Sequence, residues 1–283
     1  VCQRRFDAAH ALSLIESHSI TNLYLVPTLY HDLLSHEAFA NSNVTTVRKL
    51  GFAGQAMTDG LLKKLQTAFN LDLFVNHYGS SEIYTFTIEP DAPAKPGSAG
   101  KAGLNQEIRV IKLDSIDADD LVEGDDEGQI IAALDGDEAF EGYWKRPEAD
   151  AKSLHDGWYF TGDVGYQDND GDLFVTGRVD DMIISGGENI LPAEIESVLS
   201  LHPAVGEVAV VGLADPRWGQ TVTAFIARSG EVNDEQLDAW CLQSNLASFK
   251  RPRAYVFVRE IPKSPVGKIL RRMLVSGDYL PEQ

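Results

Sequence analysis

Five short segments between residues 78 and 272 carry side chains that are able to do chemistry. The first reads YGSSE (78–82) and follows an apolar run that is typical of a buried strand. It would place hydroxyls, exposed backbone amides and a carboxylate at the C-terminal end of that strand, where open α/β sheets bind ligands. Taken alone, the segment is more typical of a serine-capped turn, so its meaning depends on the other four.

The other four segments add complementary groups in a fixed order. Segment 159–163 (YFTGD) ends in a carboxylate after a glycine turn, and segment 177–181 (GRVDD) sets an arginine beside two acids. Segment 184–189 (ISGGEN) contains two adjacent glycines, which suit a place where the backbone passes close to another group. Segment 262–272 (PKSPVGKILRR) is expected to put Lys268 at the start of a basic helix.

Two other segments look like ligand loops but do not fit. Segment 97–101 (GSAGK) lacks the spacing of a P-loop and follows two prolines, so a turn is expected there. Segment 168–172 (DNDGD) resembles a calcium loop. Its glycine stands at the fourth position rather than the sixth, which favours a polar hairpin turn.

The charge of the chain limits its partners. The sequence holds 24 basic and 43 acidic residues, a net charge of -19, which argues against nucleic-acid binding. Residues 250–283 nevertheless hold eight basic residues against three acidic ones, which suits either a solvated helix face or a site for a small anionic ligand. The sequence has no apolar run of about 18 residues that would span a bilayer, so a cytoplasmic protein is expected. Cys2 and Cys241 lack metal-ligand or disulfide-framework spacing.

The pattern of residues 1–90 predicts a parallel sheet with crossover helices. Asp7 is placed to cap a helix, and Thr58 is placed to cap another that runs to Phe69. Strands are expected at 23–26, 47–53 and 71–75.

The pattern changes twice after residue 90. Residues 91–179 read as a β-rich subdomain with strands at 107–112, 128–133 and 172–176. A mixed α+β unit then begins at Asp180, with a helix opening at Pro192, strands at 208–212 and 222–227, and a helix over 233–244. We therefore expect a domain boundary between Val179 and Asp180.

Taken in order, the five segments resemble the motifs of the adenylate-forming superfamily of acyl-CoA synthetases, luciferases and peptide-synthetase adenylation domains. The resemblance runs from about Phe6 to Arg272, and segments 212–222 and 249–253 are most similar to aryl-acid CoA ligases such as 4-chlorobenzoate CoA ligase. It implies an α/β fold with the second half of a large adenylation domain (1–179), then a small α+β mobile domain (180–283) hinged at Asp180. The family's upstream phosphate loop is not in the sequence, so we expect an N-terminally truncated chain that is inactive alone.

The resemblance implies an ATP-dependent carboxylate:CoA ligase that forms an acyl-AMP intermediate, with ATP, Mg²⁺ and CoA. Glu82 would help to hold Mg-ATP, Ser81 would lie at the α-phosphate, and Tyr78 would stack near adenine. Asp163 and Arg178 would hold the ribose, and Lys268 would contact the reacting carboxylate and phosphate. The remaining implied residues form three sets: Gly54 and Gly79 at the nucleotide; Gly186, Gly187, Trp218, Phe249, Arg251 and Arg253 at CoA; and Ala53, His77, Tyr84 and Thr85 in the acid pocket.

Several alternatives stay open at this stage. The chain could belong to an adenylation enzyme that loads a carrier-protein thiol, or it could be a non-catalytic fragment that keeps only the fold. Trp218 could simply pack in a core. His77 could be satisfied by backbone groups; if instead it faces the acid, the polar side chains of His77 and Tyr84 favour a hydroxylated or otherwise polar aryl acid. A homodimer is left open, and the sequence does not identify the acid.

Overall fold

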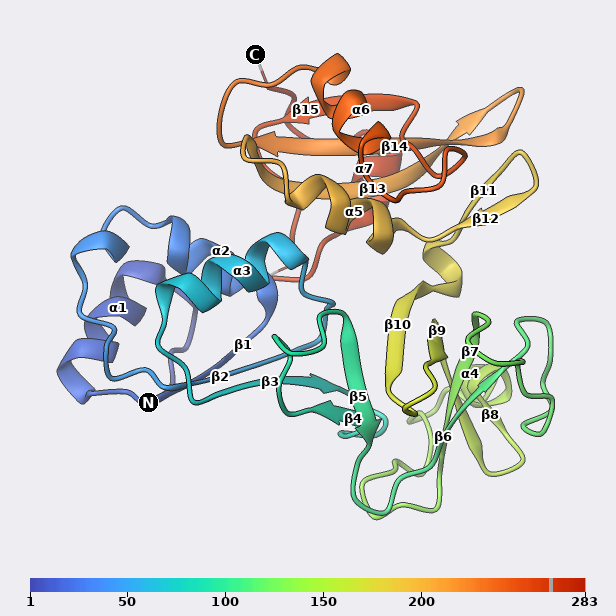
Figure 1. Ribbon diagram of the computed structural model, residues 1–283. Helices are drawn as coiled ribbons and strands as arrows, with labels where there is room; N and C mark the ends of the chain where they lie inside the picture. Colours follow the sequence, from blue (N-terminus) through green and yellow to red (C-terminus); the bar gives the residue numbers. More distant parts are fainter. Residues whose placement is uncertain (265–266, 283) are drawn as a thin grey trace. The chain divides into compact units, whose positions relative to one another are not determined.

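The computed structural model describes residues 1–264 and 267–282, and these residues form two units (Figure 1). One unit consists of residues 1–56 and 64–179, and the other of residues 57–63 and 180–283. Within the described ranges, no helix has both the length and the apolar character needed to cross a bilayer.

Residues 8–78 alternate between helices and strands as predicted, with two additions that were not predicted, a helix at 27–35 and a short 3-10 helix at 39–41. The elements of this stretch are α1 (Ala8–His18), β1 (Asn22–Leu25), α2 (Pro27–Ser35), η1 (Phe39–Asn41), β2 (Lys49–Ala53), α3 (Asp59–Ala68) and β3 (Leu73–Tyr78), and residues 59–63 of α3 are grouped with the second unit. Strands β1, β2 and β3 pair in parallel, as the alternating pattern predicts. The predicted caps are also present, because Asp7 accepts a hydrogen bond from the amide of His10 and Thr58 accepts one from the amide of Leu61.

Antiparallel strands extend this sheet through the β-rich part of the unit. They are β4 (Thr87–Glu89), β5 (Ser98–Ala102), β6 (Ile108–Ile111), β7 (Gly128–Ala133), β8 (Leu154–His155), β9 (Trp158–Gln167) and β10 (Leu173–Arg178), with α4 (Pro147–Ser153) before β8. The sheet has ten strands in the order β1-β2-β3-β4-β5-β10-β9-β7-β6, and β8 pairs with β9. The parallel part therefore continues directly into the antiparallel part, which brings the end of β3 into one sheet with β9 and β10.

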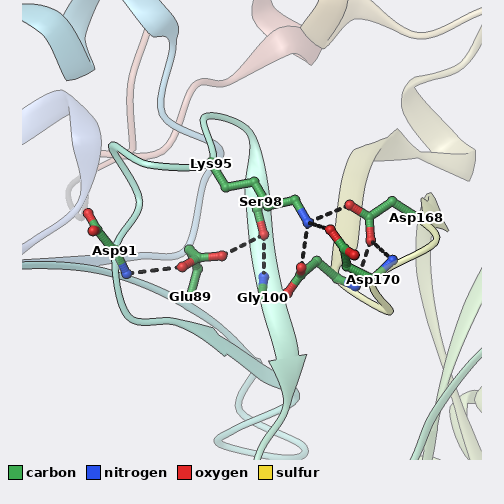
Figure 2. Close-up of polar contacts among 8 residues, drawn as sticks. Glu89, Asp91, Lys95, Ser98, Gly100, Asp168 and Asp170 are labelled. Atoms are coloured by element: carbon green, nitrogen blue, oxygen red, sulfur yellow. Dashed lines mark hydrogen bonds and ion pairs between the residues drawn. The ribbon is translucent and has the colours of Figure 1, made fainter.

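The DNDGD segment forms the predicted hairpin turn between β9 and β10. The amide of Asp168 donates to the carbonyl of Asp172 at 3.0 Å. Figure 2 shows Lys95 reaching this turn, and its Nζ lies 2.5 Å from Asp168 and Asp172 and 3.3 Å from Asp170. Because the ammonium group faces all three carboxylates, a lysine supplies the positive charge at this turn. The turn expected over segment 97–101 is present only at Gly97, which has φ +83°, because residues 98–101 belong to β5 and pair with β4 and β10.

The second unit is built around a five-stranded sheet. Its elements are η2 (Val179–Asp181), β11 (Ile183–Ser185), β12 (Glu188–Ile190), α5 (Pro192–Ser200), β13 (Val205–Asp215), β14 (Gly219–Arg228), α6 (Asp234–Leu242), β15 (Ala254–Val258) and α7 (Arg271–Ser276). The strand order is β12-β11-β14-β13, and β15 pairs in parallel with β14. The predicted α+β character is therefore present.

Alternating side chains of β13 bury two separate clusters in this unit. Val208 and Val210 pack with residues of α5 and α6, whereas Ala209 and Val211 pack with Leu274 of α7. This follows from the two-residue period of a strand, which sends successive side chains to opposite faces. Helix α6 also carries a capping box between Asn233 and Gln236.

One sequence expectation about this unit is wrong. Lys268 does not start the basic helix, because α7 begins at Arg271. The amide of Ser264 donates to the carbonyl of Lys268 at 2.8 Å, and the amide of Leu270 donates to the carbonyl of Pro262 at 2.8 Å. These bonds keep Lys268 in a hairpin before the helix. Residues 265 and 266 of the same motif lie outside the described residues.

Candidate functional site

The side chains of Tyr78, Asp163 and Arg178 meet in the first unit. Tyr78 ends β3 and its hydroxyl donates to Oδ2 of Asp163 at 2.5 Å. Arg178 ends β10, pairs in register with Asp163 of β9, and places Nη1 3.0 Å from Oδ1 of the same carboxylate. Desolvation of the Tyr78 hydroxyl and the adjacent charge of Asp163 hold the pKa of Tyr78 well above its ordinary value. The Asp163 carboxylate, 9% exposed, is therefore fixed in orientation through both of its oxygens.

Glu82 lies on a tight turn just after β3. The hydroxyl of Ser80 accepts hydrogen bonds from the amides of Glu82 and Ile83, so the serine-capped turn expected from YGSSE is present. This arrangement leaves Ser81 exposed. Gly79 is required by a close approach of the backbone, since a Cβ there would come within 1.9 Å of the carbonyl oxygen of Tyr84.

A second tyrosine holds the Glu82 carboxylate. The hydroxyl of Tyr143 donates to Oε1 of Glu82 at 2.8 Å. Desolvation opposes ionisation of Glu82, but hydrogen bonds from Tyr143 and Ser80 prevail and lower its pKa. Our sequence reasoning missed Tyr143. The cluster of aromatic residues in AFEGYW (139–144) is the only signal that could have drawn attention to it.

The four residues predicted for the acid pocket lie together at the end of the parallel strands. Ala53 of β2 and His77 of β3 are register partners. Nε2 of His77 lies 3.3 Å from the hydroxyl of Thr85, and the ring of Tyr84 packs edge-on at 4.9 Å between centroids. Burial is the main cause that lowers the pKa of His77, and it outweighs the nearby charge of Glu138. A neutral imidazole follows, with one nitrogen as donor and the other as acceptor.

Sequence reasoning missed two further residues of this cluster. The hydroxyl of Tyr24, on β1, lies 2.6 Å from Nδ1 of His77. Gly51 of β2 stands between them in the sheet, and a Cβ at Gly51 would meet Cδ2 of Tyr24 at 2.7 Å. The missing side chain at Gly51 therefore leaves the space in which the Tyr24 ring crosses β2.

Trp218 joins several of the residues predicted to contact CoA in the second unit. The amide of Gly186 donates to the carbonyl of Trp218 at 2.8 Å, and a Cβ on Gly186 would come within 2.8 Å of the indole ring. The guanidinium carbons of Arg253 and Arg217 lie 4.2 and 4.7 Å from the centroid of that ring. Gly187 has φ +90°, which favours glycine. Arg217 was not among the predicted residues.

Two predicted residues of this set line a cleft of about 410 Å³. Arg251 and Arg253 both line it, together with Asp234, Glu235, Asp238, Ser248, Pro252 and Tyr255. Nε of Arg251 lies 3.1 Å from Oδ1 of Asp238, so its charge already has an acidic neighbour. Phe249 is 41% exposed, and the ammonium of Lys250 lies 6.0 Å from its ring centroid.

Three predicted residues occupy turns. Gly54 follows β2 with φ +80°, which requires the conformational freedom of glycine. Asp180 is exposed and lies in η2, where one unit ends at Val179 and the other resumes. Lys268 is exposed at its hairpin, and its amide donates to the hydroxyl of Ser264 at 3.1 Å.

Comparison with known proteins gives the family of the chain. Residues 1–144 match the AMP-binding enzyme family, and residues 194–268 match the AMP-binding enzyme C-terminal domain. The chain belongs to the AMP-binding enzymes, so the superfamily and the α/β fold class expected from the five segments are confirmed.

Individual relatives agree with this assignment. The chain is 38% identical to a 4-chlorobenzoate–CoA ligase of Arthrobacter sp over 95% of its own length and 51% of the relative. It is 34% identical to a feruloyl-CoA synthase of Amycolatopsis sp over 94% of its length and 53% of the relative. The chain thus spans about half the length of the curated relatives it matches.

Solved structures share the fold as well. The anthranilate CoA ligase AuaEII in complex with anthranoyl-AMP superposes with a TM-score of 0.86 at 30% identity, over 95% of this chain and 52% of that one. ATP-bound MatB from Rhodopseudomonas palustris gives 0.85 at 27% identity, over 98% and 54% of the two chains.

Proposed function

We propose that the whole protein is an ATP-dependent carboxylate:CoA ligase. In the first half-reaction a carboxylate oxygen attacks the α-phosphorus of ATP, which forms acyl-AMP and releases pyrophosphate. In the second, the CoA thiol attacks the acyl carbon, loses its proton and releases AMP. The observation that carries this proposal is the Asp163 carboxylate, held between Tyr78 and Arg178 in a chain of the AMP-binding family.

The first unit would bind the nucleotide. A carboxylate with a fixed orientation suits the two adjacent hydroxyls of a ribose, and the guanidinium of Arg178 adds donors beside it. Exposed Ser81 and the turn glycines Gly54 and Gly79 would face the phosphates. Tyr78 would border the adenine with its ring while its hydroxyl holds Asp163.

The donor set of this region fits Mg²⁺. Glu82 offers a carboxylate that hydrogen bonds from Tyr143 and Ser80 keep ionised, and magnesium in nucleotide sites needs only one or two carboxylates beside the phosphates. Bound Mg²⁺ would neutralise phosphate charge. Glu82 would hold the ion, and Tyr143 would keep that carboxylate in place.

The second unit would supply the groups that differ between the half-reactions. Lys268 would contact the carboxylate and phosphate oxygens during adenylation, where charge develops. Residues 180–283 would act as a mobile domain that rotates about Asp180 against the adenylation domain in residues 1–179. This rotation would remove Lys268 from the active site and bring in the Gly186-Gly187 turn and the CoA site. Adenine of CoA would stack on Trp218 or Phe249, and Arg253 and Arg251 would face its phosphates.

The acid is proposed to be an aryl acid with a polar ring substituent. Tyr24, His77 and Thr85 form a chain of hydrogen-bonding groups beside Ala53 and Tyr84. The names of the relatives, which include 4-chlorobenzoate and feruloyl-CoA enzymes, support an aryl acid.

We further propose a cytoplasmic enzyme, since ATP and CoA are available there, and a homodimer, which native mass spectrometry would test.

Two measurements on the full-length protein test this function. Pyrophosphate release that depends on both ATP and a carboxylic acid, followed by AMP release that depends on CoA, is the expected result. Release of AMP with a carrier-protein thiol but not with free CoA would instead favour carrier loading.

A panel of benzoate and hydroxybenzoates tests the acid class, because His77→Ala should reduce the preference for the hydroxylated acid. An unchanged preference would reject the polar pocket.

A further inference from the structure

Arg271, the first residue of α7, makes a partly buried ion pair with α5. Its Nη2 donates to both oxygens of Glu196, at 2.7 and 2.8 Å. Glu196 is only 6% exposed, and its Oε1 also accepts the amide of Val210 from β13 at 2.8 Å. The pair therefore ties the start of α7 to both α5 and β13.

The same guanidinium also reaches the start of the second unit. Its Nη1 lies 3.7 Å from Oδ2 of Asp181, which belongs to η2 and follows Asp180 directly. Burial would lower the pKa of Arg271, but the charges of Glu196 and Asp181 prevail and raise it. The guanidinium stays charged, with Nη2 hydrogen bonded to α5 and Nη1 facing η2.

Lys268 lies three residues before Arg271, on the hairpin that leads into α7. The other leg of this hairpin is held by Lys263, whose Nζ lies 2.6 Å from Oε1 of Glu207 on β13. The two legs join through Lys263 and Ile269, which form a bridge. Arg271 thus anchors the C-terminal side of the hairpin that carries Lys268.

We propose that Arg271 is a positioning residue for Lys268, which fixes the lysine hairpin to α5 and to the Asp181 end of the unit. The inference rests on the role of Lys268 under the proposed function. Because the hairpin is held to the residues beside Asp180, Lys268 turns together with the unit when the chain rotates there. Small misplacement of a reacting group costs much of its rate, so an exposed lysine needs such support.

Energetics favour positioning over stability as the role of this pair. The cost of removing two charges from water roughly offsets their attraction, so a buried ion pair contributes little net stability. The forked guanidinium, in contrast, fixes direction because it binds two carboxylates at once. An ammonium at position 271 keeps the charge but has no second nitrogen to face Asp181 while the first binds Glu196.

The test compares Arg271→Lys with Arg272→Lys in the full-length protein. Arg272 is the exposed neighbour on the same helix, so the control makes the same chemical change. For Arg271→Lys we expect the adenylation kcat to fall by about tenfold or more while KM for ATP stays within about twofold. Thioester formation from preformed acyl-AMP should stay within about twofold, and the control should match the wild type.

Two results would overturn the role. One is an equal loss in both half-reactions together with a lower melting temperature, since that indicates general damage to the unit. The other is no loss in either half-reaction. If Arg271→Lys does not fold, Asp181→Asn replaces it, because that change removes only the contact next to Asp180 and should slow adenylation selectively by a smaller factor.

Hydrogen exchange separates this inference from the proposed function. The amides of Gly267, Lys268 and Leu270 are hydrogen bonded within the hairpin. In Arg271→Lys they should exchange faster than in Arg272→Lys, while β13 and β14 keep their protection. This measurement needs no enzymatic activity. It therefore tests whether Arg271 anchors the hairpin even if the wild type activates no acid. Unchanged exchange would contradict the anchor.

Discussion

The hydroxyl of Tyr24 lies 2.6 Å from Nδ1 of His77, although β2 separates the strands that carry them. The contact exists because Gly51 on β2 has no side chain at the point where the Tyr24 ring crosses. Since burial lowers the pKa of His77, the imidazole is neutral, so one of its nitrogens donates and the other accepts; the role of Nδ1 toward Tyr24 is therefore coupled to the role of Nε2 toward Thr85.

Gly51→Ala should displace Tyr24 and change how the acid binds. The added methyl group would meet Cδ2 of Tyr24 at 2.7 Å, so the ring must move. We expect KM for the acid to rise about tenfold with little change in KM for ATP. Acid titrations of pyrophosphate release measure this, and Tyr24→Phe serves as the comparison, because it removes the hydroxyl and keeps the ring. A wild-type KM in both variants would contradict the role of the contact.

Stability should fall in mild acid because of two partly buried histidines. Desolvation lowers the pKa values of His77 and His202 in the folded state. The unfolded chain then binds more protons than the folded one, so this stabilisation is complete above about pH 6.5 and is lost as pH falls through the lower folded-state values. Denaturant midpoints measured at steps of about one pH unit between pH 8 and pH 5 follow this loss of stability. His202→Gln should flatten the profile, and an unchanged slope would contradict the assignment.

Lys268→Ala should separate the two half-reactions. Loss of one charge-stabilising group should slow adenylation by about 100-fold or more, roughly 3 kcal/mol, and spare thioester formation from preformed acyl-AMP. Single-turnover assays in the full-length protein measure both steps. Arg272→Ala, on the same basic segment, is the control. Equal slowing of the two steps would show that Lys268 does not have the proposed role.

Trp218→Ala should raise the apparent KM for CoA and leave acyl-AMP formation nearly intact. Stacking on an aromatic ring contributes about 1–3 kcal/mol per base, so a loss of roughly tenfold or more in CoA affinity is expected. Arg251→Ala and Arg253→Ala should also weaken CoA binding, and higher salt should weaken it in the wild type. If Trp218 serves only as packing for Gly186 and Arg253, its removal lowers the melting temperature and harms both half-reactions.

Local signals in the sequence determined the helices and the family. Asp7 caps α1 and Pro192 opens α5, as their positions predict, and α6 starts at the predicted place, where the structure adds an Asn233 cap. These signals act within a few residues of one another, so they can be read along the chain. The order of the five segments likewise identified the AMP-binding enzymes before any geometry was known.

The tertiary structure alone decided how the candidate site is held. Tyr24 and His77 are 53 positions apart, and Tyr143 and Glu82 are 61 apart. Such contacts depend on strand register and on loops that return to the sheet, which no short pattern encodes. The same limit explains the error at Lys268, because hydrogen bonds to Ser264 and Pro262 hold that segment in a hairpin although its residues also suit a helix. The sequence thus determined which groups are present, and long-range packing decided which of them meet.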